Sequence, residues 1–242
     1  MTSLAVSQEI AIMGRLSPTD LSVEPGHLVA VIGPNGGGKT SLLRAMARTE
    51  DAGGAVFIDG HDLDSVAEAG RRRLVAFMPA SRETPWPIRV VDFIQLGLGT
   101  PDPARLDHLV TALELAPLTM RPIDRLSTGE RARAMLARAL AGKARLLLLD
   151  EPLSNLDPYW VLRTIELLRA EIADKSRSAM VSVHDLGLIK RFDRVLLVTG
   201  GVVVGDGTPA DVLASDAFGA AFRIEPDGAG WAIRPVDRQS LR

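Results

Sequence analysis

The sequence lacks cysteine, long apolar runs and most aromatic residues. Without cysteine, this chain of 242 residues can form neither a disulfide nor a cysteine-ligated metal site, which agrees with a reducing compartment. No apolar run reaches the roughly 18 residues of a membrane-spanning helix, and no basic segment followed by an apolar one marks an export signal at the N-terminus. We therefore expect a soluble protein that reaches a membrane only through a partner.

Neither sign of charge dominates the chain. It has 28 basic and 30 acidic side chains and a net charge of −2, so no bulk positive charge favours nucleic acid, and we expect no nucleic-acid partner. The length fits one α/β domain with a substantial core, or two small domains. We predict a single domain over residues 1–242.

A glycine-rich loop is the most informative stretch of the chain. Residues 33–40 have the spacing G-x-x-x-x-G-K-T, after an apolar run at 28–32 and before a helical pattern at 41–46. A backbone with few Cβ atoms can wrap phosphate oxygens, with its N–H groups pointing inward at a helix N-terminus. Lys39 is then expected to reach the β- and γ-phosphates, and the Thr40 hydroxyl to bind Mg²⁺. A plain glycine-rich turn is the less favoured alternative. The predicted nucleotide-binding residues here are Gly33, Pro34, Asn35, Gly36, Gly37, Gly38, Lys39, Thr40 and Ser41.

The pattern of apolar residues changes twice along the chain. Short strand-like runs precede residue 81, with a turn expected at 17–18 and a buried strand at 74–78. Helical periods separated by prolines fill residues 81–142, which we predict to be a helical subdomain inserted into an α/β scaffold. Strands and helices then alternate, which argues for a mostly parallel sheet, and a turn is expected at 205–207.

Two carboxylates follow an aliphatic strand. The run Leu146 to Leu149 ends in Asp150 and Glu151. Carboxylates at the end of a buried strand are costly unless something binds them, and ligands sit at this edge of α/β sheets. We expect Asp150 to hold Mg²⁺ and Glu151 to polarise an attacking water. An acidic turn is the alternative, which the phosphate loop makes less favoured.

A further candidate site precedes the helical pattern at 131–140. Ser127 and Glu130 form an S-x-x-E capping box, which by itself indicates only a helix start. The Ser127 hydroxyl and the bare backbone of Gly129 also suit a phosphate.

Together these motifs resemble the nucleotide-binding subunits of ABC transporters over nearly the whole chain. Residues 33–40 are similar to the Walker A loop, 126–130 to the family signature (LSTGE, where LSGGQ or LSGGE is commonest), and 146–151 to the Walker B strand. Residues 154–157 resemble the D-loop, and His184 resembles the switch histidine. All stand in the family's order.

The resemblance implies a P-loop ATPase fold of mixed α/β class, with an antiparallel β part, and a composite site. In this family two domains pair head to tail, and ATP lies between the Walker A loop of one and the signature of the other. Ser127 and Gly129 are then expected to touch the γ-phosphate of a second copy, and Asp157 to cross the interface. Glu151 is expected to act as the base or as the group that orients the water, with His184 and Lys39 on the γ-phosphate. The implied partners are a second nucleotide-binding subunit, integral membrane permease subunits and, indirectly, a substrate-binding protein, at the inner face of the cell membrane.

Two positions depart from the family pattern. Ala80 stands where the family usually has a glutamine that contacts Mg²⁺ and couples the helical lobe to the core. Counting back from the loop places Ile10 where an aromatic residue commonly stacks on adenine, and no aromatic residue precedes Phe57. We expect weaker selectivity for adenine, because an aromatic stack contributes on the order of 1 kcal/mol.

Residues 85–92 and 205–213 resemble importers of iron chelates, haem and cobalamin. We therefore predict the ATP-hydrolysing subunit of an importer for an iron chelate or haem. Trp86 suits equally an aromatic packed on its own lobe or one that docks on the permease. Two alternatives stay open: a soluble ATPase of the same type with a non-membrane partner, and a regulatory subunit that binds nucleotide but hydrolyses it weakly.

Overall fold

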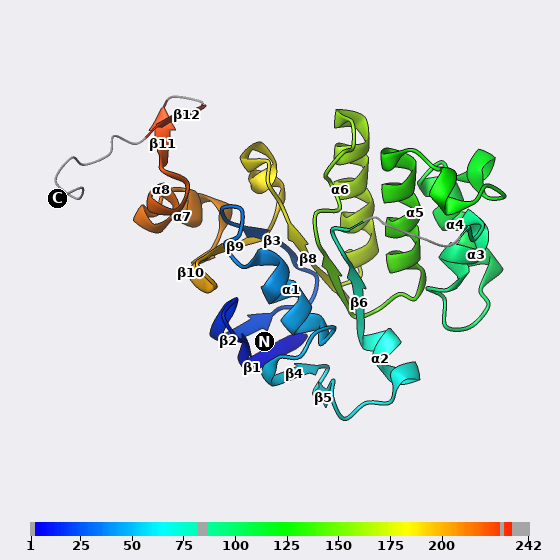
Figure 1. The fold of residues 1–242 in the computed structure, drawn as a ribbon, viewed down its shortest axis with the longest axis horizontal. Coiled ribbons are helices and arrows are strands. Elements are labelled where there is room, and N and C mark those ends of the chain that lie inside the picture. Colours follow the sequence, from blue (N-terminus) through cyan, green and yellow to red (C-terminus); the bar gives the residue numbers. More distant parts are fainter. Residues whose placement is uncertain (1–2, 82–86, 228–229, 234–242) are drawn as a thin grey trace.

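The central feature of the computed structural model is a six-stranded sheet (Figure 1). The structure describes residues 3–81, 87–227 and 230–233. The order of the sheet is β10-β9-β3-β8-β7-β6; β10 is antiparallel to β9, and the other neighbours are parallel. The strands are β3 (Leu28–Ile32), β6 (Val75–Met78), β7 (Leu146–Leu149), β8 (Ser178–Ser182), β9 (Arg194–Thr199) and β10 (Val202–Gly207).

A smaller antiparallel sheet covers one side of the molecule. Its order is β2-β1-β4-β5. Its strands are β1 (Ala5–Ile12), β2 (Leu16–Val23), β4 (Gly53–Ile58) and β5 (His61–Asp62), and a separate hairpin near the C-terminus consists of β11 (Ile224–Asp227) and β12 (Gly230–Ile233). The prediction of a mostly parallel core with an antiparallel part is confirmed.

Helices lie against both sheets. The α-helices are α1 (Lys39–Ala47), α2 (Glu68–Leu74), α3 (Val90–Gln95), α4 (Pro103–Ala112), α5 (Thr128–Ala141), α6 (Pro158–Ile172), α7 (Pro209–Leu213) and α8 (Asp216–Phe222). The 3₁₀ turns are η1 (Ala116–Leu118), η2 (Ile123–Arg125) and η3 (Leu186–Arg191). Helix α1 lies between the two sheets, and α5 and α6 lie on the other side of the central sheet (Figure 1).

Alternation along the central strands explains this layering. In β7, Leu147 and Leu149 belong to the core cluster shared with α5 and α6, whereas Leu146 and Leu148 belong to the cluster around α1. Successive side chains of a strand point to opposite faces, so a strand covered on both faces is apolar throughout. The aliphatic run predicted as a strand is therefore buried at every position.

In the described part of 81–142, the helices are joined by turns and irregular segments, and the only strand-like pairing there is one isolated bridge between Arg89 and Pro122. Helices α3, α4 and α5 lie there, near the predicted helical periods. Most buried apolar residues of these helices belong to the same cluster as one face of the central sheet. The boundary of a subdomain at 81–142 stays a prediction.

Two predicted turns were wrong, and one predicted strand is confirmed but starts one residue later and is less buried than expected. The strand expected at 74–78 begins at Val75, because Leu74 still belongs to α2, and it is mostly half-buried because β6 is an edge strand. The turn expected at 17–18 lies inside β2, another edge strand, where a proline is tolerated. The turn expected at 205–207 lies inside β10, because Gly200 and Gly201, both with positive φ, form the turn earlier.

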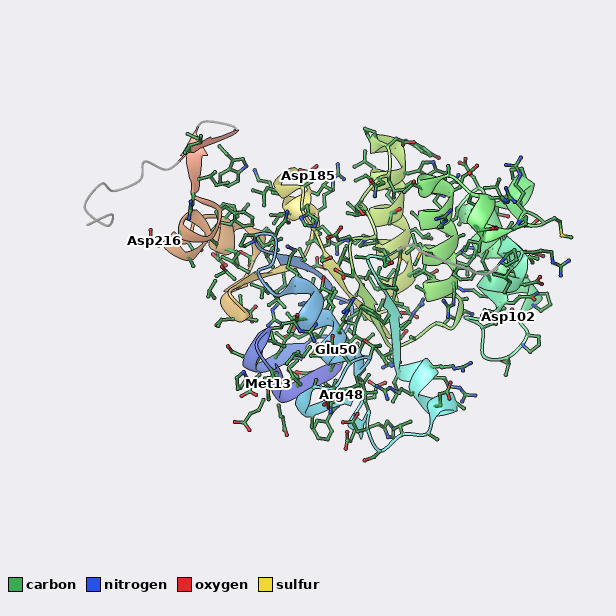
Figure 2. The ribbon with its side chains drawn as sticks, viewed as in Figure 1. Met13, Arg48, Glu50, Asp102, Asp185 and Asp216 are labelled. Carbon is green, nitrogen blue, oxygen red and sulfur yellow. The ribbon has the colours of Figure 1, made fainter. Side chains whose placement is uncertain are left out.

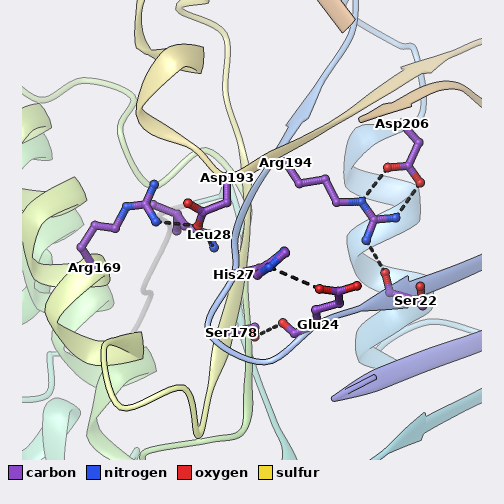
Figure 3. A network of polar contacts seen from close by, with 9 residues as sticks. All are labelled: Ser22, Glu24, His27, Leu28, Arg169, Ser178, Asp193, Arg194 and Asp206. Atoms are coloured by element: carbon purple, nitrogen blue, oxygen red, sulfur yellow. Dashed lines mark hydrogen bonds and ion pairs between the residues drawn. The ribbon is translucent and has the colours of Figure 1, made fainter. Parts of the chain in front are cut away.

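A polar network fastens the smaller sheet to the central one (Figure 3). The Arg194 guanidinium bonds both carboxylate oxygens of Asp206 and donates to the carbonyl of Ser22 in β2. Asp193 accepts from Arg169 of α6 and from the backbone N–H of Leu28. The start of β3 is thereby fixed relative to β2, β9 and α6.

Candidate functional site

Three neighbouring parallel strands deliver the predicted site residues to one edge of the central sheet. The glycine-rich loop follows β3, Asp150 and Glu151 follow β7, and His184 lies two residues beyond β8. The carboxyl ends of parallel strands meet at the same edge, which is where ligands bind in such sheets. Residues distant in sequence are thereby brought together.

The loop lies too close to β9 for side chains at two of its glycines. A Cβ on Gly37 would lie 2.7 Å from the carbonyl oxygen of Val198, and a Cβ on Gly33 would clash with the same atom. Gly37 donates to the Pro34 carbonyl at 3.0 Å, and Gly201 donates to the Gly37 carbonyl at 2.9 Å. The loop backbone is therefore held against β9 and against the turn that follows it.

Lys39 begins α1 and lies folded back over the loop. Its side chain is 6% exposed, and Nζ donates to the carbonyl oxygens of Gly33 at 2.9 Å and Pro34 at 3.0 Å. Burial lowers the pKa of Lys39, while the charges of Glu151 and Asp150 oppose that effect. Gly38 caps α1 without a side-chain hydrogen bond, so the positive end of the helix is left to a ligand.

Asp150 is a buried carboxylate at this edge of the central sheet and is 1% exposed. Its Oδ2 accepts from Thr40 Oγ1 at 2.8 Å, and its Oδ1 accepts from Ser182 Oγ at 2.7 Å. Ser182 Oγ also accepts from the backbone N–H of Glu151 at 2.7 Å. The proposed metal residues, Thr40 and Asp150, are therefore in direct contact.

Sequence reasoning missed Ser182. The only signal was a hydroxyl in the otherwise apolar run at 179–183, and the sequence does not reveal that its side chain reaches both carboxylate residues. A buried hydroxyl needs hydrogen-bond partners, and here they are Asp150 and Glu151.

Glu151 and His184 form a pair at the mouth of the site. Oε1 of Glu151 lies 2.7 Å from Nε2 of His184. Glu151 has φ +51°, an unusual value for a residue with a long side chain. Strained backbone of this kind is concentrated at functional sites.

A cavity of about 1450 Å³ runs over this edge toward the turn between β1 and β2. Its lining includes the loop, Glu151 and His184, together with the turn residues. Of the predicted nucleotide-binding residues, it is lined by Asn35, Gly36, Gly37, Gly38, Lys39, Thr40 and Ser41. Gly33 and Pro34 lie behind the lining and accept the Lys39 hydrogen bonds.

The expectation that Ile10 faces the adenine was wrong. Ile10 is 0% exposed in the core around α1, because β1 directs it inward. Met13 lies at the turn after β1, is 99% exposed and lines the cavity (Figure 2). The cavity wall beyond the loop therefore offers a thioether rather than an aromatic ring.

The signature residues lie elsewhere. Ser127 caps α5, and both halves of the predicted capping box are present: Ser127 Oγ accepts from the Glu130 N–H, and Glu130 Oε2 accepts from the Ser127 N–H. That backbone hydrogen bond is the main cause of the lowered pKa of Glu130. Ser127, Gly129 and Asp157 do not line the cavity. Asp157 instead caps α6 by accepting from the Trp160 N–H at 3.0 Å.

The donor set suits Mg²⁺ held jointly with phosphate. No group of three or more His, Cys, Asp or Glu that could hold a metal occurs within the part of the chain that the structure describes. Mg²⁺ is commonly bound by one or two carboxylates, substrate phosphates and water, which Asp150 and Thr40 would complement. Ala80 contributes only a methyl group, and Trp86 lies outside the described residues.

The sequence is similar to ATP-binding subunits of transporters. Residues 16–154 match the family model described as ABC transporter. A cobalamin import ATP-binding protein of Halobacterium salinarum is 36% identical over 217 residues, which are 86% of this chain and 54% of that protein. The chain thus spans about half the length of that relative. A hemin import ATP-binding protein of Pseudomonas fluorescens is 36% identical over 223 residues, 87% of each protein.

Solved structures agree at the level of the fold. A dimeric ATP-binding cassette bound to ADP and phosphate matches with a TM-score of 0.76 and 21% identity, covering 85% of this chain and 98% of that chain. An Atm1-family ABC exporter with ATP bound matches with a TM-score of 0.77 and 23% identity, covering 88% of this chain and 40% of that chain. Among the described residues, no helix is both long enough and apolar enough to cross a membrane.

Proposed function

Because this chain belongs to the ABC transporter family, we propose that it is the ATP-hydrolysing subunit of an importer. The observation that carries the proposal is the cavity that brings Lys39, Thr40, Glu151 and His184 together at one sheet edge. A triphosphate there would meet backbone N–H groups, a buried ammonium group and a carboxylate beside a histidine. This is the set of groups that phosphoryl transfer requires for positioning and charge stabilisation.

The residues of the site take distinct roles in this proposal. Lys39 binds the β- and γ-phosphates in place of the two carbonyl oxygens that it contacts now. Glu151 orients the attacking water and accepts its proton on the carboxylate, and His184, paired with that carboxylate, contacts the γ-phosphate. Mg²⁺ bound by Asp150 and Thr40 would neutralise charge on the phosphate oxygens.

We propose that two copies of the chain complete each other's site. Ser127 and Gly129 lie at the N-terminus of α5, outside the cavity, with Ser127 exposed to solvent. A helix N-terminus with an exposed hydroxyl and a bare backbone suits a γ-phosphate carried by a second copy. ATP binding would then close the pair, and hydrolysis would reopen it.

A groove beside β6 supports a membrane partner. It has a volume of about 330 Å³ and is lined by residues of β6, α3 and α5. Phe93 and Met135 form part of its wall, and the lining residue Leu96 is 56% exposed, which is unusual for a large apolar side chain. We propose that a cytoplasmic segment of a permease occupies it, which would place the chain at the inner face of the membrane.

The cargo is proposed from relatives alone. Proteins named for hemin, cobalamin and petrobactin import match this chain over 86–87% of its length. An iron chelate or haem is therefore the proposed substrate class of the transporter. Cargo specificity resides in the other subunits, so it is tested by uptake into vesicles that contain the whole transporter.

Ala80 favours a second candidate, a subunit that binds nucleotide but hydrolyses it weakly. A methyl group can neither bind Mg²⁺ nor relay movement of the helical segment to the site. Steady-state hydrolysis of saturating Mg-ATP, with and without the co-purified permease, decides between the two candidates. Turnover that rises with the permease supports the importer, and negligible turnover in both states supports the regulatory subunit. A soluble partner in place of the permease would support the non-membrane alternative.

A further inference from the structure

A buried ion pair joins the helical stretch to α6. Arg105 of α4 is 8% exposed and Glu171 of α6 is 5% exposed. The two Nη atoms of Arg105 each donate to one carboxylate oxygen of Glu171, both at 2.8 Å. A bidentate pair of this kind fixes relative orientation as well as distance.

The same guanidinium also holds the end of α5. Arg105 Nη2 donates to the carbonyl oxygen of Leu140 at 2.7 Å, in the last turn of that helix. Carbonyl groups in the last turn lack partners within the helix, and a cation there complements the helix dipole. Arg177, just before β8, donates to Glu171 at 2.7 Å and anchors the carboxylate to the central sheet. One cluster thus joins α4, α5, α6 and the start of β8.

The other end of α5 carries Ser127 and Gly129. A helix of 14 residues is about 21 Å long, so a tilt of about 10° at one end would displace the other by roughly 4 Å. Near its N-terminus, α5 also contacts α6 through Arg133, whose guanidinium lies 4.2 Å from the centre of the Trp160 ring. The Arg105 cluster and this contact together set the angle between the two helices.

We propose that Arg105 and Glu171 are positioning residues that aim the N-terminus of α5 at the nucleotide bound by a second copy. This inference rests on the proposed function. A buried ion pair adds little net stability over an apolar pair of similar size, because desolvation offsets the attraction between the charges, although removing one partner alone destabilises the protein. The cluster of Arg105, Arg177 and Glu171 therefore serves mainly to fix the relative orientation of α4, α5, α6 and β8.

The first test uses the single chain and measures the position of the α5 N-terminus relative to β5. Because the sequence has no cysteine, Arg125→Cys beside the start of α5 and His61→Cys on β5 accept spin labels without background. The distance distribution between the labels is measured by pulsed electron resonance in the otherwise unaltered chain, in Glu171→Gln and in Arg105→Lys. We expect a shift of several ångströms, or clear broadening, in both substituted proteins.

A second ion pair provides the matched control. Arg194 and Asp206 also form a two-bond pair, but it joins β9 to β10, at the edge of the central sheet opposite β6 and α5. Asp206→Asn and Arg194→Lys should leave the label distance unchanged. A distance that is equally unchanged in Glu171→Gln and Arg105→Lys, or that shifts equally in the controls, overturns the inference.

The functional readout uses the full-length chain with Glu151→Gln, a substitution that we expect to slow hydrolysis. Glu171→Gln or Arg105→Lys in this background should raise the ATP concentration for half-maximal dimer formation at least tenfold, while the affinity of the monomer for fluorescent ADP changes less than twofold. Unchanged dimer formation, or an equal loss of ADP affinity, contradicts a positioning role. If the Glu151→Gln parent itself never dimerises with ATP, the proposed function fails and the inference falls with it, whatever the label distances show.

Discussion

Nε2 of His184 lies 2.7 Å from Oε1 of Glu151, although the two residues follow different strands. Strands β7 and β8 are parallel neighbours, so their carboxyl ends place the two side chains at one mouth of the cavity. A carboxylate held by a histidine beside the phosphate loop can receive a proton from an attacking water.

Replacing the Glu151 carboxylate should slow ATP hydrolysis without weakening ATP binding. In Glu151→Gln we expect turnover of Mg-ATP to fall by roughly 10²–10⁴-fold, because general base catalysis contributes about that factor. ATP affinity should be retained, since Lys39 and the loop backbone are unaffected. Phosphate release and equilibrium binding measure the two quantities. Unchanged turnover would remove Glu151 from the mechanism.

Ser182 supports both carboxylate residues. Ser182→Ala should lower turnover by roughly 10–100-fold, the usual effect of losing a group that orients a metal ligand. Ser178→Ala is the matched control, because it removes another buried hydroxyl of β8, one that donates to the carbonyl of Glu24 away from the site (Figure 3). Equal effects of the two substitutions on turnover would show that Ser182 acts only on stability.

Met13 faces the part of the cavity beyond the phosphate loop. Met13→Tyr should tighten ATP binding about fivefold, because an aromatic stack adds on the order of 1 kcal/mol. Ile10→Val should instead lower stability by about 0.5–1.5 kcal/mol without changing nucleotide affinity, since Ile10 is a core residue. Titration with a fluorescent nucleotide and urea unfolding measure these effects. A Met13→Tyr protein with unaltered affinity would place the base elsewhere.

Acid should weaken the cluster around Glu171. Burial alone would raise the pKa of Glu171, but hydrogen bonds and the charges of Arg105 and Arg177 lower it below its ordinary value of 4.5. As the pH falls below that value, the unfolded chain takes up the proton first, so the stabilisation present at neutral pH is progressively lost. Urea unfolding should therefore show a difference between the unaltered protein and Glu171→Gln that shrinks in acid. A difference independent of pH would contradict the lowered pKa.

The sequence predicted the local chemistry better than the spatial assembly. The loop spacing, the aliphatic strand before Asp150 and the capping box at Ser127 all depend on neighbours in the chain, and these elements lie where they were expected. Ile10 was assigned by counting residues, which cannot show that β1 directs this side chain into the core. Ser182 and Arg105 were missed because their partners lie 32 and 66 residues away along the chain. Contacts of that range are set by the fold.

The central claim is that each nucleotide is enclosed by the loop of one copy and the α5 N-terminus of another. Lys39→Ala disables the first half of the site, and Ser127→Arg disables the second. The most direct measurement is Mg-ATP hydrolysis by each substituted chain alone and by an equimolar mixture. The account predicts that each is inactive alone and that the mixture recovers part of the activity, because mixed pairs contain one intact site. A mixture as inactive as its components, or full activity of the Ser127→Arg chain alone, would contradict it.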